Sequence, residues 1–300
     1  MTAPPRAAVW AMAAGALVIS TTSIFVKWAH VAPTVSAFYR MGFGGALLFL
    51  LLLVQRRWQG VNRRDVLWML FPAAAFAVDL VLWHRSIRDV GPGLATLLGN
   101  FQVFVMALAG VWFYRERLGW RFAAGLGLAF AGLWLLVGRN WTGVDAQYRG
   151  GVWFGILTGV AYAAYMLSFR HAQKEKLQRS PGELLCLNSL LCAGLLALVV
   201  LAEGDSFRIP DTQSLAALLG LALFGQVLGW LLIAYAMPQL PASLVGLLLL
   251  LQPGLSFVLD VILFGRPTVA ADWIGLLVSL AGIFLAGAMT ARKPADEPVS

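Results

Sequence analysis

The sequence is divided into ten apolar runs that are separated by short loops. The runs of the amino-terminal half lie near residues 8–26, 35–54, 66–86, 94–114 and 122–137, and those of the other half near residues 152–169, 184–201, 215–236, 244–264 and 273–289. A membrane-spanning helix needs about 20 apolar residues. Because backbone groups cannot stay unpaired in lipid, such runs must be helical. The sequence therefore predicts an all-α integral membrane protein with ten transmembrane helices.

Composition excludes several other classes of protein. Hydrophobic residues make up 60% of the 300 residues and charged residues only 12%, which leaves no segment for a separate soluble domain. The net charge of +8 does not indicate a nucleic-acid partner, because the basic residues fall in loops beside the apolar runs. The expected surroundings are membrane lipid. Cys186 and Cys192 lie in one run without a metal-ligand spacing, and no nucleotide-binding loop is found. We expect no cofactor and no metal.

Positive residues are distributed unevenly between the two sides of the expected bundle. With the amino terminus inside, 14 of the 22 lysine and arginine residues lie on the inner side and 8 on the outer side. This bias predicts that both termini are cytoplasmic. The first run ends without a convincing small-residue cleavage site, so we expect it to be retained as the first helix.

The two halves of the chain correspond at an offset of 150 residues. Five pairs of identical residues recur at this offset: Leu94 and Leu244, Gln102 and Gln252, Gly125 and Gly275, Ala131 and Ala281, and Gly132 and Gly282. We therefore expect two five-helix repeats, residues 1–145 and 146–300. Because five is odd, the second repeat must be inverted in the membrane. Inverted repeats are typical of secondary transporters, whose site lies near the midplane where the repeats meet.

Asp79 and Arg40 are the charged candidates for such a site. Asp79 lies inside an apolar run, where a carboxylate costs several kcal/mol unless it pairs or faces water. It is a candidate proton site or substrate-cation site. Arg40 lies about two turns into the second run, where it either pairs with Asp79, as we favour, or contacts an anionic substrate. His84 points roughly 140° away from Asp79 on the same helix, so a direct bond between them is not expected.

Three amides are the uncharged polar candidates. Asn100 follows the Gly91-Pro92-Gly93 reversal, and both it and Asp79 are expected about 10 Å below the outer surface. Gln102 and Gln252 reach roughly 14 Å depth from opposite faces, so both approach the midplane. Each amide either faces a cavity or bonds a neighbouring helix backbone. The sequence Gln252-Pro253-Gly254 predicts an interruption of the ninth helix.

Aromatic and hydroxyl side chains complete the set of candidates. Trp83, Tyr165 and Trp230 either line a cavity for amphipathic or aromatic solutes or anchor helix ends at the interface. The hydroxyl cluster at residues 20–23 either faces a pore or bonds within its own helix. Glycines at close spacing, such as Gly155 and Gly159, favour helix packing within the protomer, with a homodimer as the alternative.

Two segments carry a resemblance to a family: LWHRSIRDVGPGLATLLGNFQVFVMALAGVWFYRERL and LVGLLLLLQPGLSFVLDVILFGRP. Together with the ten runs, they resemble the drug/metabolite transporter superfamily, EamA type. The resemblance implies export of small metabolites, amino acids or drugs across the inner membrane by alternating access, with proton coupling or exchange. Arg40 and Glu116 match positions that the family usually fills with Arg and Glu. Arg266, the repeat counterpart of Glu116, departs from that pattern.

Two other functions stay open. An integral-membrane enzyme acting on a lipid-like substrate would need clustered carboxylates or histidines at one membrane face. The three histidines, His30, His84 and His171, are scattered, so we expect no enzyme. An uncoupled exchanger or a channel is compatible with the repeats, and the sequence does not separate it from a coupled transporter.

Overall fold

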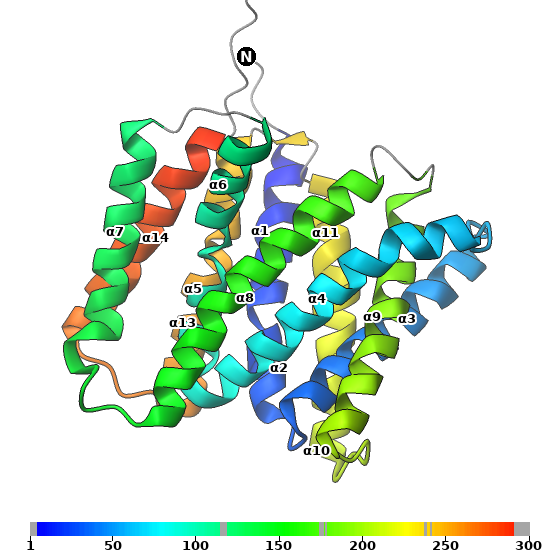
Figure 1. The fold of residues 1–300 in the computed structure, drawn as a ribbon, viewed down its shortest axis with the longest axis horizontal. Coiled ribbons are helices and arrows are strands. Elements are labelled where there is room, and N and C mark those ends of the chain that lie inside the picture. The colour runs from blue at the N-terminus through cyan, green and yellow to red at the C-terminus, as the bar shows by residue number, and fades with distance from the viewer. Residues whose placement is uncertain are drawn as a thin grey trace, which may run out of the picture.

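The computed structural model describes residues 5–114, 119–173, 177, 179–236, 239–240 and 242–290. Every regular element in these ranges is a helix (Figure 1). The first half contains α1 (Arg6–Ser20), α2 (Thr22–Trp28), α3 (Pro33–Val54), α4 (Arg63–Val90), α5 (Pro92–Gly99), α6 (Gln102–Tyr114), α7 (Trp120–Leu136) and the short turn η1 (Gly138–Asn140). The second half contains α8 (Ala146–His171), α9 (Pro181–Glu203), α10 (Thr212–Gly220), the π-helical segment η3 (Leu221–Leu228), α11 (Gly229–Ala236), α12 (Ala242–Leu249), α13 (Leu251–Phe264) and α14 (Ala270–Thr290).

Helix length and apolar content identify a membrane protein. Within the described ranges, seven segments are long and apolar enough to cross a membrane, and three further apolar helices are shorter. Large apolar side chains remain exposed on the bundle, including Val54 at 82% and Trp112 at 84%. Lipid is the surroundings in which such exposure is favourable. The all-α membrane fold is thus confirmed, whereas the count of ten crossings stays a prediction.

Two of the expected spans are broken at corresponding positions. The fourth is divided at Asn100 and Phe101 into α5 and α6, and the ninth is divided at Leu250 into α12 and α13. Asn100 and Leu250 are 150 residues apart, the offset of the repeat. The second break therefore precedes the predicted interruption at Gln252-Pro253-Gly254. Pro253 instead lies in the first turn of α13, where its missing N–H is tolerated.

Corresponding helices of the two halves pack against one another in antiparallel fashion. In Figure 1, α7 and α14 lie side by side at one edge of the bundle. Gly125 contacts Gly282 and Gly132 contacts Gly275, and the hydroxyl of Ser279 donates to the carbonyl of Ala129 at 3.1 Å. The earlier glycine of α7, Gly125, meets the later glycine of α14, Gly282, so the two helices run antiparallel. A Cβ on Gly125 would lie 2.7 Å from the carbonyl oxygen of Gly282.

The pair α3 and α9 shows the same arrangement. Gly45 contacts Ser189 and Leu190, and Leu52 contacts Gly182 at the other end of the pair. The first residue of α3, Pro33, precedes the first residue of α9, Pro181, by 148 positions. Small residues allow both pairs to approach closely without a hydrophobic driving force between them.

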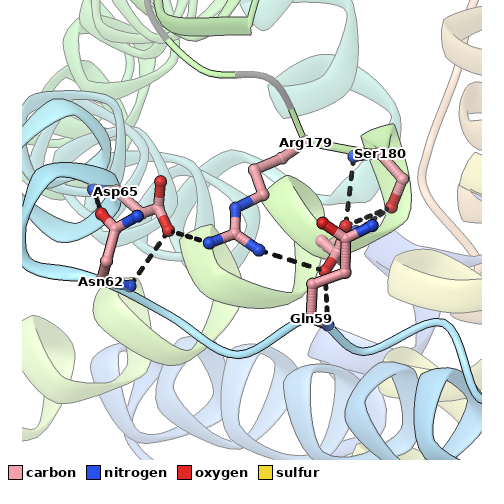
Figure 2. Close-up of polar contacts among 6 residues, drawn as sticks. Gln59, Asn62, Asp65, Arg179 and Ser180 are labelled. Carbon is pink, nitrogen blue, oxygen red and sulfur yellow. Dashed lines mark hydrogen bonds and ion pairs between the residues drawn. The ribbon is translucent and has the colours of Figure 1, made fainter.

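A buried ion-pair network fastens the start of α4 to the start of α9 (Figure 2). Asn62 and Asp65 form one reciprocal helix cap, and Ser180 and Glu183 form another. Arg179 lies between the caps, with Nη2 2.7 Å from Asp65 and Nη1 3.7 Å from Glu183. Glu183 also accepts a 2.9 Å hydrogen bond from the backbone N–H of Gln59. Since Asp65 and Glu183 are both buried, the guanidinium compensates two carboxylates at once.

The other end of the α3 and α9 pair carries a corresponding contact. Nδ1 of His30 lies 2.9 Å from Asp211, which caps α10 by accepting from the backbone N–H of Ser214. His30 and Asn62 each precede their counterparts, Arg179 and Asp211, by 149 positions. The hydrogen bond from Ser214 and then the bond with His30 lower the pKa of Asp211. The contact between His30 and Asp211 is exposed to water, whereas the network around Arg179 is buried.

We expect Gly132→Ala to destabilise the bundle by about 1–3 kcal/mol, because the new methyl group would overlap the backbone of Gly275 and Ser279. The matched control is Gly127→Ala on the same helix, where a Cβ meets nothing within 4 Å. That control should be neutral or slightly stabilising. Equilibrium unfolding in detergent micelles would measure both variants, and equal behaviour of the two would contradict the close α7 and α14 contact.

We expect Arg179→Met to destabilise the protein by about 3 kcal/mol, because it leaves two buried carboxylates without their cation. Arg88, whose side chain is 57% exposed beside Asp89, provides the control. Arg88→Met should cost less than about 1 kcal/mol. The same unfolding measurement tests the pair, and an Arg179→Met variant as stable as Arg88→Met would show that the network does not fasten the two helices.

Candidate functional site

A cavity of about 350 Å³ lies where the two halves meet. Its lining comes from α1, α2, α3, α4, α5, α6, α8, α11, α12, α13 and α14 and from Asn100 and Leu250 at the two corresponding helix breaks. Apolar side chains make up about half of the lining residues. The polar and aromatic-polar ones are Thr22, Arg40, Asp79, Trp83, Thr96, Asn100, Gln102, Thr158, Tyr162, Trp230 and Gln252. An apolar pocket with a few convergent polar groups is the usual form of a small-molecule site.

The helix breaks open onto this cavity. Gly99, Asn100 and Gln102 line it from the first break, and Leu250 and Gln252 line it from the second. The side-chain amide of Asn100 donates to the carbonyl of Thr96 at 2.8 Å, so part of it serves its own helix end. Oε1 of Gln102 is buried and has no hydrogen-bond partner among the described residues. The amide of Gln102 therefore keeps acceptor capacity beside the cavity.

Arg40 and Asp79 both line the cavity but do not bond each other. Arg40 is 7% exposed and Asp79 is 5% exposed. Among the described residues, no ion pair within 4.0 Å joins them and no hydrogen bond reaches either side chain. The guanidinium of Arg40 instead lies over the ring of Trp83, 5.5 Å from its centroid. The favoured pairing of the two charges is thus not formed, although each lies within electrostatic reach of the other.

His84 takes no part in this arrangement with Asp79. Its Nδ1 bonds the hydroxyl of Ser36 on α3, as expected for a side chain that points away from the carboxylate. Asn188, which follows Arg40 by 148 positions, is fully buried, and neither polar atom of its amide has a partner among the described residues. It does not line the cavity, so the second half supplies no charge at the position corresponding to Arg40.

Tyr165 lies behind the cavity wall rather than on it. Its ring stacks on Phe76 with centroids 4.3 Å apart, and its centroid lies 5.8 Å from that of Tyr162. Phe76 and Tyr162 are the lining residues. The other seven residues proposed from the sequence all line this single cavity. Thr22 also lines the cavity, and its hydroxyl donates to the carbonyl of Ile19 at 2.7 Å. Thr22 therefore both faces the cavity and bonds back along the chain, the two alternatives considered for the hydroxyl cluster.

Sequence reasoning missed several wall residues. Thr96 and Thr158 are single hydroxyl residues in otherwise apolar stretches of sequence. Met106, Met166 and Phe284 are ordinary apolar residues. Only the close spacing of Gly155 and Gly159 indicated that α8 packs tightly at this place. Gly155 contacts Leu98, and Gly159 contacts Gln102, so that α8 lies against the first helix break. Thr158 belongs to the same turn as these glycines.

Polar contacts join the two halves between the cavity and the Gly91-Pro92-Gly93 reversal. The hydroxyl of Ser256 on α13 bonds Ser23 and Thr96. Beyond it, the carboxylate of Asp260 accepts from the backbone N–H of Gly93 at 3.2 Å. These contacts join the two halves at that end of the bundle.

Arg266 adds to the contacts at this end. Nη1 of Arg266 donates to the carbonyl of Val90 at 2.7 Å and lies 3.2 Å from Asp260. The guanidinium also lies over the ring of Phe257. A carboxylate at position 266 could neither donate to the carbonyl of Val90 nor form an ion pair with Asp260. Glu116, its counterpart, lies outside the described residues.

Comparison with known proteins identifies the architecture. A model of the EamA-like transporter family matches residues 6–138 and again residues 149–288. The chain belongs to the EamA-like transporter family. One solved crystal structure shares the fold of this family member with a TM-score of 0.64 and 18% sequence identity, over 96% of this chain and 99% of the other. No curated protein gave a significant match.

Membership confirms the resemblance predicted from the sequence. Proteins of the EamA-like family are membrane transporters rather than enzymes, so the chain is a multi-pass membrane protein of a transporter family. Within the described ranges, no three His, Cys, Asp or Glu side chains gather into a group that could hold a metal ion. The cavity offers instead a pair of charges, amides, hydroxyls and apolar walls, which are the means of binding a solute reversibly.

Proposed function

We propose that this EamA-like protein is a secondary transporter that exports a small metabolite, amino acid or drug across the inner membrane by alternating access. The observation that carries the proposal is the cavity between the halves, which holds two buried and unbonded charges in a membrane-spanning bundle. Intramembrane charges are rare and mark substrate or ion pathways. The contacts between the two halves at the reversal end are of the kind that could hold one side shut while the other opens.

The proposed topology is ten transmembrane helices in two inverted repeats, residues 1–145 and 146–300. Antiparallel packing of α7 with α14 and of α3 with α9 supports the inversion, because each pair joins corresponding helices. The excess of positive residues on the side of the amino terminus supports cytoplasmic termini. In this arrangement the cavity is the fixed site around which the two repeats move.

Asp79 is proposed to hold the coupling proton or the cation of the substrate. Arg40, Trp83, Trp230 and the amides of Asn100, Gln102 and Gln252 contact the substrate in this scheme, while Tyr165 supports the wall through Phe76. A carboxylate that has no fixed partner is suited to exchange one cationic partner for another. Asp79 meets that condition among the described residues.

We expect Asp79→Asn to abolish solute-dependent proton movement while the protein still folds. Purified protein would be reconstituted in liposomes that contain a pH indicator, and pools of amino acids, metabolites and cationic drugs would be added. Asp205 provides the control, since its carboxylate lies outside the cavity and no hydrogen bond to it is formed within the described ranges. Asp205→Asn should transport like the wild type.

Normal gradient-driven flux in Asp79→Asn would refute the role of this carboxylate. Solute exchange without proton movement in the wild type would favour an uncoupled exchanger, and unitary currents in planar bilayers would favour a channel. Turnover of a labelled lipid would favour an enzyme.

A further inference from the structure

The cavity contains one positive and one negative side chain. Among the described residues that line it, Arg40 and Asp79 are the charged ones, and they come from neighbouring helices α3 and α4. Both are at least nine-tenths buried. The cavity therefore has no formal excess of charge when both groups are ionised, but it presents two separate and opposite poles to whatever enters.

Among the described residues, neither charged group has a salt bridge or a hydrogen bond from the protein. A buried charge is costly unless it is paired and hydrogen-bonded, yet the guanidinium of Arg40 has only the ring of Trp83 beside it, and the carboxylate of Asp79 has no bonding partner in the described ranges. A direct salt bridge would have compensated both, but the two groups are more than 4.0 Å apart. Both side chains line the same cavity, so one ligand in it can contact both.

The charge of a ligand decides how well it fits such a cavity. A cation would pair with Asp79 and leave Arg40 without a partner, and an anion would do the reverse. A neutral solute would displace water from both groups and pair with neither. A solute that carries both charges would compensate both, and Arg40 can grip a carboxylate through two parallel N–H bonds.

We propose that the cavity selects a small zwitterion, whose ammonium group binds Asp79 and whose carboxylate binds Arg40. The apolar remainder of the solute then packs on the walls formed by Phe76, Leu80, Met106 and Phe284. The cavity volume of about 350 Å³ suits a single small molecule. The proposal deepens the proposed function, on which it rests for the movement of the solute but not for its binding.

A set of four compounds tests the requirement for both charges. Leucine is the zwitterion, leucinamide the cation, N-acetylleucine the anion and N-acetylleucinamide the neutral control, and a second set built on phenylalanine covers a larger apolar group. Binding would be measured by calorimetry and by thermal stabilisation of the purified protein in detergent. We expect the zwitterion of at least one set to bind at least tenfold more tightly than its three relatives.

Two variants then make the assignment of each charge falsifiable. Asp79→Asn should shift the preference at least tenfold toward the N-acetyl anion, and Arg40→Gln should shift it at least tenfold toward the amide cation. Asp79→Glu and Arg40→Lys keep the charges and should keep the preference for the zwitterion. A misfolded variant binds nothing, so opposite shifts in the two variants cannot arise from loss of structure. If Asp79→Asn fails to fold, Arg40→Gln and Arg40→Lys still test the role of Arg40. If Arg40→Gln fails to fold, Asp79→Asn and Asp79→Glu still test the role of Asp79.

The outcomes separate this proposal from the transporter proposal. Opposite shifts in binding, without movement of any solute into liposomes, would support the zwitterion site and overturn the transport function. Movement of solutes without a preference for the zwitterion, or with equal shifts in both variants, would overturn the zwitterion site and leave the transport function intact. Failure of the wild type to bind any of the eight compounds would also overturn the zwitterion site.

Discussion

A lipid bilayer offers no water to backbone N–H and C=O groups, and the rest of this structure depends on that constraint. Helices satisfy their own backbone, so a helix can be broken at membrane depth only where protein or a cavity covers the break. The breaks at Asn100 and Leu250 obey this rule, since both residues line the cavity. Each break also turns side chains of the following helix, Gln102 and Gln252, toward the same space. The cavity and the broken helices therefore depend on each other.

The same constraint gives meaning to the unpaired charges. In a water-soluble protein, a lone arginine beside a tryptophan would be unremarkable, because solvent would cover the remaining donors. Inside a bundle in lipid, Arg40 and Asp79 persist only if water or a solute in the cavity compensates their charges. The close glycine contacts elsewhere, between α7 and α14 and between α3 and α9, keep the surrounding helices packed while these two groups stay unbonded.

The sequence predicted the helices, and seven of the eight residues proposed from it for the site line one cavity, for physical reasons that also explain what the sequence did not reveal. Apolar length identifies membrane helices, and polar side chains within them are rare enough to stand out, so Asp79, Arg40 and the three amides could be found. The way in which side chains of different helices pack against one another cannot be read from residue types in this manner. The distance that separates Arg40 from Asp79, the retreat of Tyr165 behind Phe76 and the bonds of Arg266 to Val90 and Asp260 all depend on packing. The sequence predicted the break of the ninth helix at Gln252-Pro253-Gly254, whereas it lies at Leu250. The reason is that Pro253, on which the prediction depended, is tolerated in the first turn of a helix.

The difference between Arg40 and its counterpart Asn188 has a consequence for how such a protein can evolve. A homodimer built from a single repeat would place every residue in the cavity twice, with two arginines and two aspartates related by symmetry. Duplication and fusion within one gene release the two copies from identity, so that one can keep a charge while the other loses it. A solute without two-fold symmetry then has a single way to bind, and selection can act on one orientation alone.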